Sequence, residues 1–295
     1  MNSSLHTYLR EKARHGTPDF PAGFYDVRVP WDYQDMPYHW HEEMEFTLVR
    51  EGSVRYSVDL TTVEVRSGDL LLIPPDTLHS AHQIGEQTCR TNSVVFHLNL
   101  AGLGEEDACA ERFIRPLREG RLRLPPVVRP GDPFYEALLS CFQRLWACRD
   151  GETPFRELLF RMELLRLVLV LWEKVGVPGE SLPRRVSHPY EEKLKLALAY
   201  IQEHYAEPIT VKQLADLCGF SQVHFMNVFR QAIGATCIQY LIEYRLALAA
   251  AELQESDRPV TQIALDSGFQ NISYFNRSFK SHYHVTPSLY RRRRA

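Results

Sequence analysis

Two groups of histidine and acidic residues in the first third of the chain have the side-chain types and the spacing of ligands. Written out with the glycines and proline that accompany them, the groups are His39-x-His41-x3-Glu45-x6-Gly52 and Gly68-x5-Pro74-x4-His79. On a strand, alternation puts His39 and His41 on the same side. Imidazole nitrogens and carboxylate oxygens suit iron, manganese, nickel or zinc. Metal binding is therefore the first chemistry that these residues indicate.

The spacing of the two groups resembles both conserved motifs of cupins. The resemblance implies that His39, His41, Glu45 and His79 ligate a single divalent metal inside a small β-barrel. One departure lies between the ligands, since Asp76 stands where the second cupin motif usually has glycine. The four ligand positions themselves are kept.

The last hundred residues contain an internal repeat. Gln213-Leu214-Ala215, Gly219-Phe220, Phe225 and Phe229 recur as Gln262-Ile263-Ala264, Gly268-Phe269, Phe275 and Phe279. Each copy predicts a short helix, a turn with glycine at positive φ, and a second helix, with Ser221 and Asn271 as the N-caps of the second helices. A repeat of this size is either a packing repeat or a device for contacting a periodic partner, and DNA is the obvious periodic partner.

The second helix of each copy divides into an inward phenylalanine face and an outward polar face. The outward residues that we expect to contact DNA are Gln222, Val223, Met226, Asn227, Arg230, Ser273, Asn276, Arg277 and Lys280. Arg277 can bond a guanine edge bidentately and Asn227 or Asn276 an adenine edge. Arg230 and Lys280 are better placed for phosphates. Residues 236–253 predict a long helix that holds the two units at the spacing of adjacent major-groove segments, about 34 Å.

Residues 190–292 resemble the DNA-binding domain of AraC/XylS-type transcription regulators. The signature runs from Gly268 to Lys280 and is followed by Thr286-Pro287 and Tyr290-Arg291. His284 departs from the family pattern, which usually has glycine there, so we expect a turn that is either strained or differently shaped. The resemblance implies double-stranded DNA as partner and activation through contacts with RNA polymerase. Because the outward faces of the copies differ, the DNA half-site should be asymmetric.

Sensor domains of this family often keep a similar histidine pattern as the polar lining of an effector pocket. This resemblance leaves a second interpretation open, in which His39, His41, Glu45, Tyr56 and His79 bind a small effector with no metal required. A sugar or another polar metabolite would suit such a lining. Periodicity leaves undecided which of four aromatic residues face inward, namely Trp31, Tyr38, Trp40 and Phe96.

The middle of the chain predicts two helices. Asp132-Pro133 is the N-cap and first turn of a helix over 134–149, and Thr153-Pro154 opens another that continues to about Lys174. The second is apolar on most sides, so it must pack on the barrel and leave a surplus that suggests a homodimer interface. Residues 176–183 are rich in proline and glycine, which predicts a linker.

Composition narrows the class of protein. The net charge is −3, with 12 Lys and Arg against 10 Asp and Glu from residue 188 onward, so the basic bias is local. The tail Arg291–Arg294 is either a solubilising end or an extra phosphate contact. Six cysteines without paired spacing indicate reduced, mostly buried thiols. With no signal peptide and no apolar run long enough for a bilayer, we expect a cytoplasmic protein without membrane contact.

The sequence therefore predicts an α+β multidomain protein. Residues 1–103 form an antiparallel cupin-like barrel or jelly roll, 104–187 a helical dimerisation and linker segment, and 188–295 an all-α domain with helix-turn-helix units near 210–232 and 259–282. The function is an effector-controlled transcription regulator, more an activator than a repressor, and not an enzyme. Two alternatives stay open: a metal-dependent cupin enzyme fused to a DNA-binding module, and a repeat that binds protein instead of DNA.

Overall fold

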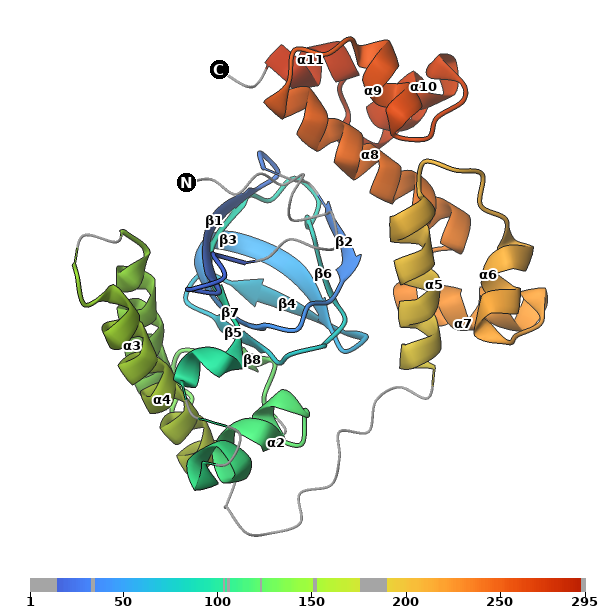
Figure 1. Ribbon diagram of the computed structural model, residues 1–295. Coiled ribbons are helices and arrows are strands. Elements are labelled where there is room, and N and C mark those ends of the chain that lie inside the picture. The colour runs from blue at the N-terminus through green and yellow to red at the C-terminus, as the bar shows by residue number, and fades with distance from the viewer. Residues whose placement is uncertain are drawn as a thin grey trace.

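The computed structural model describes residues 15–32, 35–102, 104, 107–122, 124–150, 153–175 and 190–292. The start of the chain, where we expect no signal peptide, the predicted linker at 176–183 and the last arginines of the tail lie outside these residues. The described residues form an N-terminal β-sheet unit with helices on its flank, and a C-terminal helical unit that lies against another side of the sheets (Figure 1).

The N-terminal unit consists of two antiparallel sheets that share one long strand. The strands are β1 (Ala22–Val29), β2 (Asp35–His39), β3 (Met44–Val58), β4 (Thr61–Arg66), β5 (Leu70–Ile73), β6 (His79–His82), β7 (Cys89–Phe96) and β8 (Val127–Val128). The first sheet has the order β1-β7-β3-β5-β8, while β6 joins β2 to the far half of β3, which also pairs with β4. Strand β3 thus passes from one sheet into the other.

A bulge and a glycine allow β3 to change sheets. The register against β7 shifts between Val49 and Glu51, and Gly52 follows with φ +70°. A Cβ at Gly52 would lie 1.7 Å from the carbonyl oxygen of Thr88, so only glycine fits this turn. The residues packed between the sheets are mostly aliphatic: Val29, Met36, Val49, Val54, Tyr56, Val58, Val65, Leu71, Ile73, Ala81 and Cys89.

The predicted antiparallel fold is confirmed, but the barrel is open. Among the described strands, β1, β8, β2 and β4 each pair on one side only, so the ladder of hydrogen bonds does not run round in a ring. Open edges of this kind must be covered, and helices pack on both sheets.

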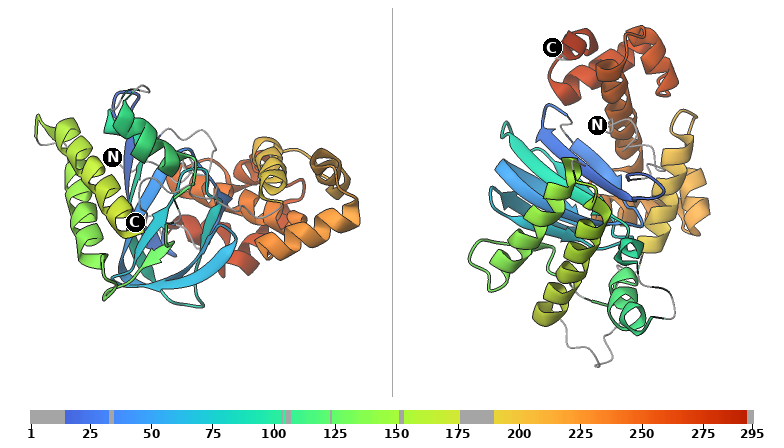
Figure 2. Two further views of the ribbon diagram at one scale, coloured as in Figure 1. Left: turned by 90° about the horizontal axis from the view of Figure 1, so that it is seen from below. Right: turned by 60° about the vertical axis from the view of Figure 1, so that its left-hand side comes forward.

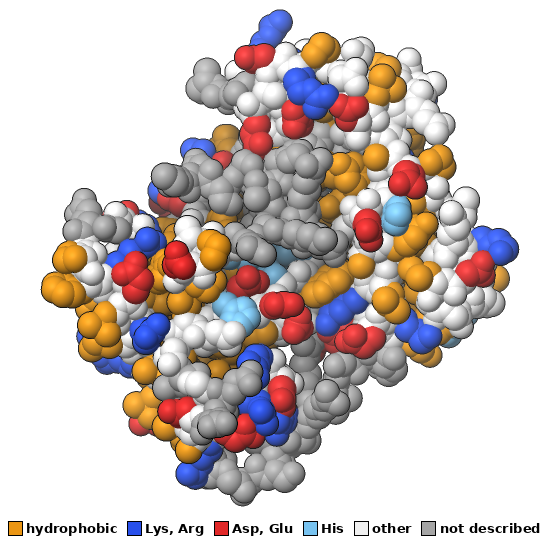
Figure 3. Space-filling model, viewed as in Figure 1, with side chains coloured by type: hydrophobic (Ala, Val, Ile, Leu, Met, Phe, Trp, Pro, Cys, Tyr) orange, Lys and Arg blue, Asp and Glu red, His pale blue; other side chains and the backbone are white. Residues whose placement is uncertain are grey.

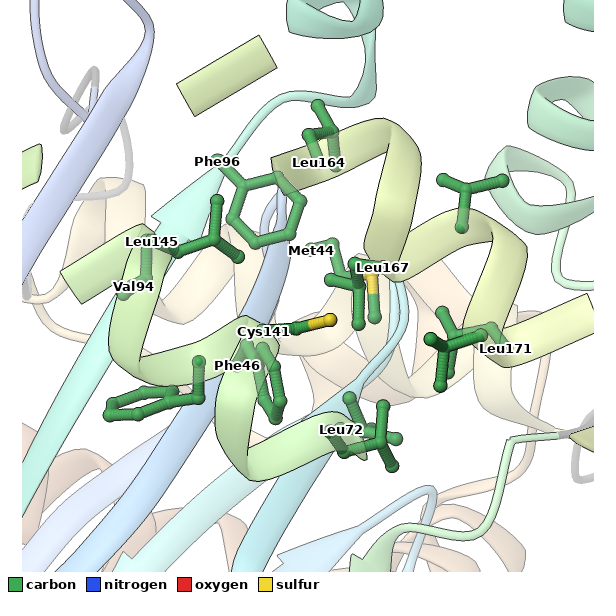
Figure 4. Close-up of a cluster of buried hydrophobic side chains, with 14 of the residues drawn as sticks. Met44, Phe46, Leu72, Val94, Phe96, Cys141, Leu145, Leu164, Leu167 and Leu171 are labelled. Atoms are coloured by element: carbon green, nitrogen blue, oxygen red, sulfur yellow. The ribbon is translucent and has the colours of Figure 1, made fainter. Parts of the chain in front are cut away.

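Helices from the middle of the chain cover the outer face of the first sheet. They are α3 (Tyr135–Ala147) and α4 (Arg156–Val175), preceded by the short turns η1 (Leu98–Ala101), η2 (Ala110–Ile114) and α2 (Arg115–Arg118) and separated by η3 (Cys148–Asp150). Figure 4 shows Met44, Phe46, Leu72, Val94 and Phe96 of the sheet facing Cys141, Leu145, Leu164, Leu167 and Leu171 of the helices. Sheet and helices share this core, and β8 also comes from the middle segment, whereas the boundary at residue 103 stays a prediction.

The predicted N-cap of α3 is wrong, although the helix starts within one residue of the predicted Phe134. The helix begins at Tyr135 behind Phe134, whose side chain makes no cap, and not behind Asp132. The Asp132 carboxylate instead accepts the backbone N–H of Arg129 at 2.7 Å and closes a turn before the helix. A side chain that can cap a turn as well as a helix is ambiguous in sequence.

The C-terminal unit contains seven helices within residues 190–292. They are α5 (Glu191–His204), α6 (Val211–Cys218), α7 (Gln222–Ile233), α8 (Cys237–Glu255), α9 (Val260–Asp266), α10 (Ile272–Tyr283) and α11 (Pro287–Arg292). Ser221 and Asn271 accept the backbone N–H of His224 and Tyr274, which confirms the predicted N-caps of α7 and α10. Thr236 and Gln239 form a reciprocal capping box at the start of α8, and Gly219 ends α6 with φ +67°.

The long helix α8 joins the two helix-turn-helix units, as Figure 2 shows. Its first half, with Tyr240 and Tyr244, packs with α5, α6 and α7. Its second half, with Ala250 and Leu253, packs with α9, α10 and α11. One rigid helix thus belongs to both small cores, which accounts for the fixed separation that the sequence predicts.

Candidate functional site

The four predicted ligand residues converge between the two sheets. Ligand atoms of His39, His41 and His79 all lie within 4.8 Å of one another. Glu45 Oε2 lies 3.7 Å from His41 Nε2 and 3.5 Å from His79 Nε2. His39 ends strand β2, and His41 follows two residues later, so the expectation that both lie on one strand is wrong in detail although both rings reach the same site.

Backbone oxygens orient all three imidazoles in the same way. Each Nδ1 lies within hydrogen-bond distance of a carbonyl oxygen two residues away: His39 to Pro37 at 2.9 Å, His41 to Glu43 at 3.0 Å and His79 to Thr77 at 2.7 Å. A carbonyl oxygen only accepts, so each Nδ1 carries a proton, and in the neutral form of each ring the lone pair lies on Nε2. This is the tautomer that binds metal through Nε2.

Glu45 is held by two hydroxyl groups on its other oxygen. Thr47 Oγ1 donates to Glu45 Oε1 at 2.7 Å, and Ser93 Oγ donates to the same oxygen at 3.1 Å. Burial alone would raise the pKa of Glu45, but the imidazoles of His41 and His79 more than offset this and leave the pKa well below its usual range. The carboxylate is therefore charged, with Oε2 directed at the imidazoles.

Burial makes His39 a poor base. Desolvation, followed by the neighbouring His79 and His41, lowers the pKa of His39 well below its usual value. His39 is consequently neutral across the physiological range, which is the form that a metal ligand requires.

Three buried polar atoms at the centre of this cluster have no hydrogen-bond partner. They are His41 Nε2, Glu45 Oε2 and His79 Nε2, and they face one another. Leaving such atoms unpaired costs free energy, so their convergence calls for an occupant. Three imidazoles and one carboxylate are a ligand set that fits a divalent transition metal.

His15 and Tyr25 also reach the cluster, and we did not predict them. The His15 ring lies 5.1 Å from the His41 ring, and its Nδ1 is 2.6 Å from the hydroxyl of Tyr25. Burial lowers the pKa of His15 to about 3, followed by the effect of His41. Thr47 was predictable, because alternation places it on the same face as Glu45, but His15 precedes the first strand and no periodic pattern locates it.

Tyr56 and the four aromatic residues lie in different surroundings. Tyr56 is buried between the sheets and pairs with Ala81, two residues along from the pair of Val58 and His79, so it shares the face of His79. Phe96 packs under α3 and α4, Tyr38 and Trp40 pack against the C-terminal unit, and Trp31 is 54 % exposed. None of these four belongs to the aliphatic core between the sheets.

The backbone conformation of Asp76 shows why the cupin pattern has glycine at this position. Its φ is +54°, in the left-handed region where glycine is most readily accommodated. Its backbone N–H donates to the carbonyl oxygen of His41 at 2.8 Å, so this turn holds the loop that carries a ligand. Aspartate tolerates the left-handed region better than most side chains do.

The second helices of the repeat present their predicted faces to solvent. All nine residues that we expect to contact DNA are exposed: Gln222, Val223, Met226, Asn227 and Arg230 on α7, and Ser273, Asn276, Arg277 and Lys280 on α10. Phe225, Phe229, Phe275 and Phe279 are fully buried on the opposite faces. These side chains are free to enter a groove, while their roles at individual bases stay predictions.

Comparison with known proteins identifies both units. Residues 25–169 match the model of the AraC-like ligand binding domain, and residues 209–293 match a helix-turn-helix domain. Regulatory protein SoxS of Salmonella typhimurium is 32 % identical over 104 residues, which are 35 % of this chain and 97 % of SoxS. The chain belongs to the AraC family of transcription regulators.

Two relatives match this AraC-family chain over most of its length. The HTH-type transcriptional regulator YdeC of Bacillus subtilis (strain 168) is 24 % identical over 96 % of both chains. The melibiose operon regulatory protein of Escherichia coli (strain K12) is 24 % identical over 86 % of this chain and 83 % of its own. The expected function is confirmed: the chain is a DNA-binding transcription regulator with a ligand-binding domain.

Two further observations concern membrane-spanning helices and the state of the cysteines. No helix in the described part of the chain is long and apolar enough to cross a membrane. All six cysteines are free thiols, five of them buried and Cys109 exposed, which agrees with the expectation of mostly buried, unpaired cysteines.

Proposed function

We propose that this AraC-family regulator reads its signal at a divalent metal held by His39, His41, Glu45 and His79. The observation that carries the proposal is the convergence of three buried, unpartnered atoms from three of these residues. Each imidazole has its Nδ1 fixed by a backbone oxygen, and Glu45 has its other oxygen fixed by hydroxyls. Such second-sphere contacts orient ligands before the metal arrives.

A bound divalent metal would offer coordination positions to hydroxyl or carboxylate oxygens of an effector. The effector that we propose is a sugar or another small polar metabolite. The hydroxyl groups of Tyr25, Thr47 and Ser93 line the same face of the first sheet, because Tyr25 pairs with Ser93 and Ser93 with Thr47. Tyr56 adds a further phenol on the interior. A relative named for the melibiose operon supports a sugar.

At the promoter, we propose that the exposed faces of α7 and α10 enter neighbouring major-groove segments. Arg277 and the asparagines would read base edges, while Arg230 and Lys280 would contact phosphates. Activation would require contact with RNA polymerase, as the family resemblance implies.

The homodimer that we propose forms through α4. Its exposed side is a continuous apolar stripe at helical spacing: Phe155, Leu158, Leu159, Met162, Leu165 and Leu169. Leu158, Met162 and Leu169 are each 57 % exposed. A contiguous apolar patch of this kind is unfavourable in water and is typical of an interaction surface. Figure 3 shows hydrophobic side chains gathered on the edge of the molecule that carries α3 and α4. A second copy of the stripe would cover it across a two-fold axis.

We propose a sensing role for the metal site and not a catalytic one, in a protein that works in the cytoplasm. The relatives are transcription regulators, and unpaired thiols suit a reducing compartment. The competing function is a metal-dependent enzyme fused to the DNA-binding unit, and the same cluster would serve it.

Metal analysis of protein purified without a polyhistidine tag tests the proposal. We expect one equivalent of a divalent transition metal in the wild type, none in His41→Ala, and a loss of effector-dependent promoter binding in that variant. Absence of metal from the wild type, after growth with iron, manganese, nickel and zinc, would leave only the metal-free effector pocket. If His41→Ala loses the metal but keeps a normal regulatory response, the enzyme alternative is favoured.

A further inference from the structure

Two neighbouring residues of β2 connect the ligand cluster with the DNA-binding unit. His39 is directed at the cluster, and Tyr38 lies on the opposite face of the strand, where it is 5 % exposed in the core formed with α5 and α8. The same alternation recurs at β6, where His79 reaches the cluster and the preceding Leu78 is fully buried in the core of the C-terminal unit. Each of these two ligands therefore sits one residue from a docking contact.

Hydrogen bonds reinforce this interface. The Tyr240 hydroxyl of α8 donates to the carbonyl oxygen of Tyr38 at 2.8 Å, and Gln202 Nε2 of α5 donates to the same oxygen at 3.4 Å. Lys195 of α5 donates to the carbonyl oxygen of Asp76 at 2.7 Å. The Asp76 N–H in turn holds the carbonyl of the ligand His41. Three ligands thus connect to the helical unit through the backbone.

The two donors to the Tyr38 carbonyl are buried and so depend on the docked arrangement. Tyr240 is 2 % exposed and Gln202 is 7 % exposed. If the helical unit separated from the sheets, Tyr38 and Leu78 would be exposed to water together with the donors that face them. The interface combines an apolar centre around Tyr38 and Leu78 with two neutral hydrogen bonds to the Tyr38 carbonyl and one charged hydrogen bond from Lys195.

We propose that β2 and β6 form a docking surface for the chain's own DNA-binding unit and that metal binding at the cluster stabilises the docked arrangement. The inference rests on the metal site proposed above. In the structure, the carboxylate oxygen of Glu45 lies 3.5 and 3.7 Å from two imidazole nitrogens, whereas ligand atoms in a tetrahedral zinc site are about 3.3 Å apart. A metal bound to Glu45, His41 and His79 would therefore need little movement of β3 and β6. His39, whose ligand atom lies within 4.8 Å of those of the other two histidines, would add β2 to the set that the metal ties together.

Tying the strands lowers the entropic cost of docking. The helical unit packs on Tyr38 and Leu78, whose backbone a metal would restrain through His39 and His79. A surface that is already ordered loses less conformational entropy when its partner docks. Linkage makes the effect reciprocal, so docking strengthens metal binding by the same factor by which metal strengthens docking.

Reciprocity gives a test in which no metal ligand is changed. Tyr240→Phe and Gln202→Met each remove one donor to the Tyr38 carbonyl and keep the size of the side chain. Zn²⁺ affinity of the full chain is measured by calorimetry with a competing chelator. We expect each variant to bind Zn²⁺ more weakly, the two together by about 5-fold or more. Tyr200→Phe is the matched control, because it removes a tyrosine hydroxyl from α5 without removing a contact with the sheets.

Small-angle scattering supplies a second measurement. Zn²⁺ should reduce the radius of gyration of the wild type, and the double variant should respond less. Equal Zn²⁺ affinity in wild type and both variants overturns the coupling and leaves the metal site intact. A similar loss in Tyr200→Phe also overturns it, since the effect would then come from general destabilisation. A wild type that binds no Zn²⁺ overturns the metal site and the coupling together.

Discussion

His284 occupies the position in the second helix-turn-helix unit that Gly234 occupies in the first. Gly234 ends α7 with φ +81°, and His284 ends α10 with φ +60°, so both residues adopt the left-handed conformation. The strain expected at His284 therefore lies in its own backbone conformation, at the end of α10. A side chain in this region costs free energy that glycine avoids, although histidine is tolerated better than most residues.

Replacing this histidine should stabilise the protein. We expect His284→Gly to raise the free energy of unfolding by about 1 kcal/mol, because the removal of a strained Cβ outweighs the extra freedom of glycine in the unfolded chain. Urea unfolding monitored by circular dichroism measures the change. Gly234→His is the reciprocal control and should lower the free energy of unfolding. If His284→Gly leaves this free energy unchanged or lowers it, the turn at His284 is not strained.

The recognition face of α10 predicts two distinct binding defects. Arg277→Ala should relax the preference at one base pair and cost about 1–3 kcal/mol on the native promoter. Lys280→Ala should weaken binding to all sequences alike and lower the slope of log K against log salt by about 0.9, the contribution of one phosphate contact. Fluorescence anisotropy at several salt concentrations, with the native site and single-base variants, separates them. Wild-type behaviour of both would mean that α10 faces away from DNA.

A substitution at Thr47 tests whether the hydrogen bond that orients Glu45 matters for metal binding, and it changes none of the four proposed ligands. Thr47→Val removes the hydroxyl that fixes Glu45 Oε1, so metal affinity should fall about 10–100-fold while all four ligands stay present. Thr91→Val is a matched control on β7, since the Thr91 hydroxyl is buried without a partner and its removal should leave metal affinity unchanged. Competition titration with a metal chelator gives both values. The same affinity in the two variants would argue against Glu45 as a ligand.

Acid should destabilise the metal-free protein through its buried histidines. The folded-state pKa of His15 is about 3, below the unfolded value near 6.5. Above pH 6.5 both states are neutral and His15 has no effect; as the pH falls from 6.5 toward 3, the unfolded state gains a proton that the folded state does not, and stability is lost. His15→Asn does not titrate and should flatten this part of the profile, as measured by urea unfolding at stepwise pH. A profile identical to wild type would contradict the burial of His15.

The apolar stripe of α4 predicts the oligomeric state. Met162→Glu places a charge in the middle of the stripe, so it should convert the dimer into a monomer at micromolar concentration. Analytical ultracentrifugation measures the state. Leu196→Glu is the control, because Leu196 is a similarly exposed apolar residue, at 51 %, but lies on α5. A monomeric wild type would remove the dimer proposal altogether.

Short-range sequence patterns were enough to predict several helix caps and the exposed faces of two helices. The N-caps at Ser221 and Asn271 and the exposed faces of α7 and α10 depend on interactions within a few residues, so spacing alone identifies them. The unusual turn expected at His284 and the side of the strand shared by Glu45 and Thr47 are local in the same sense. The N-cap of α3 was misplaced because Asp132 can cap either a turn or a helix.

What the amino-acid sequence determined by itself is the set of elements, their polar faces and the residue types that can hold a metal or contact DNA. The tertiary structure decided which elements meet. Thr47 and Ser93 are 46 positions apart, and Tyr38 and Tyr240 are 202 apart, yet each pair shares a buried site. A buried aromatic residue has the same local pattern whichever core receives it, so only the packing shows that Phe96 faces α3 and α4 and Tyr38 the DNA-binding unit. Hydrophobic burial is not directional, and partners are chosen by the whole fold.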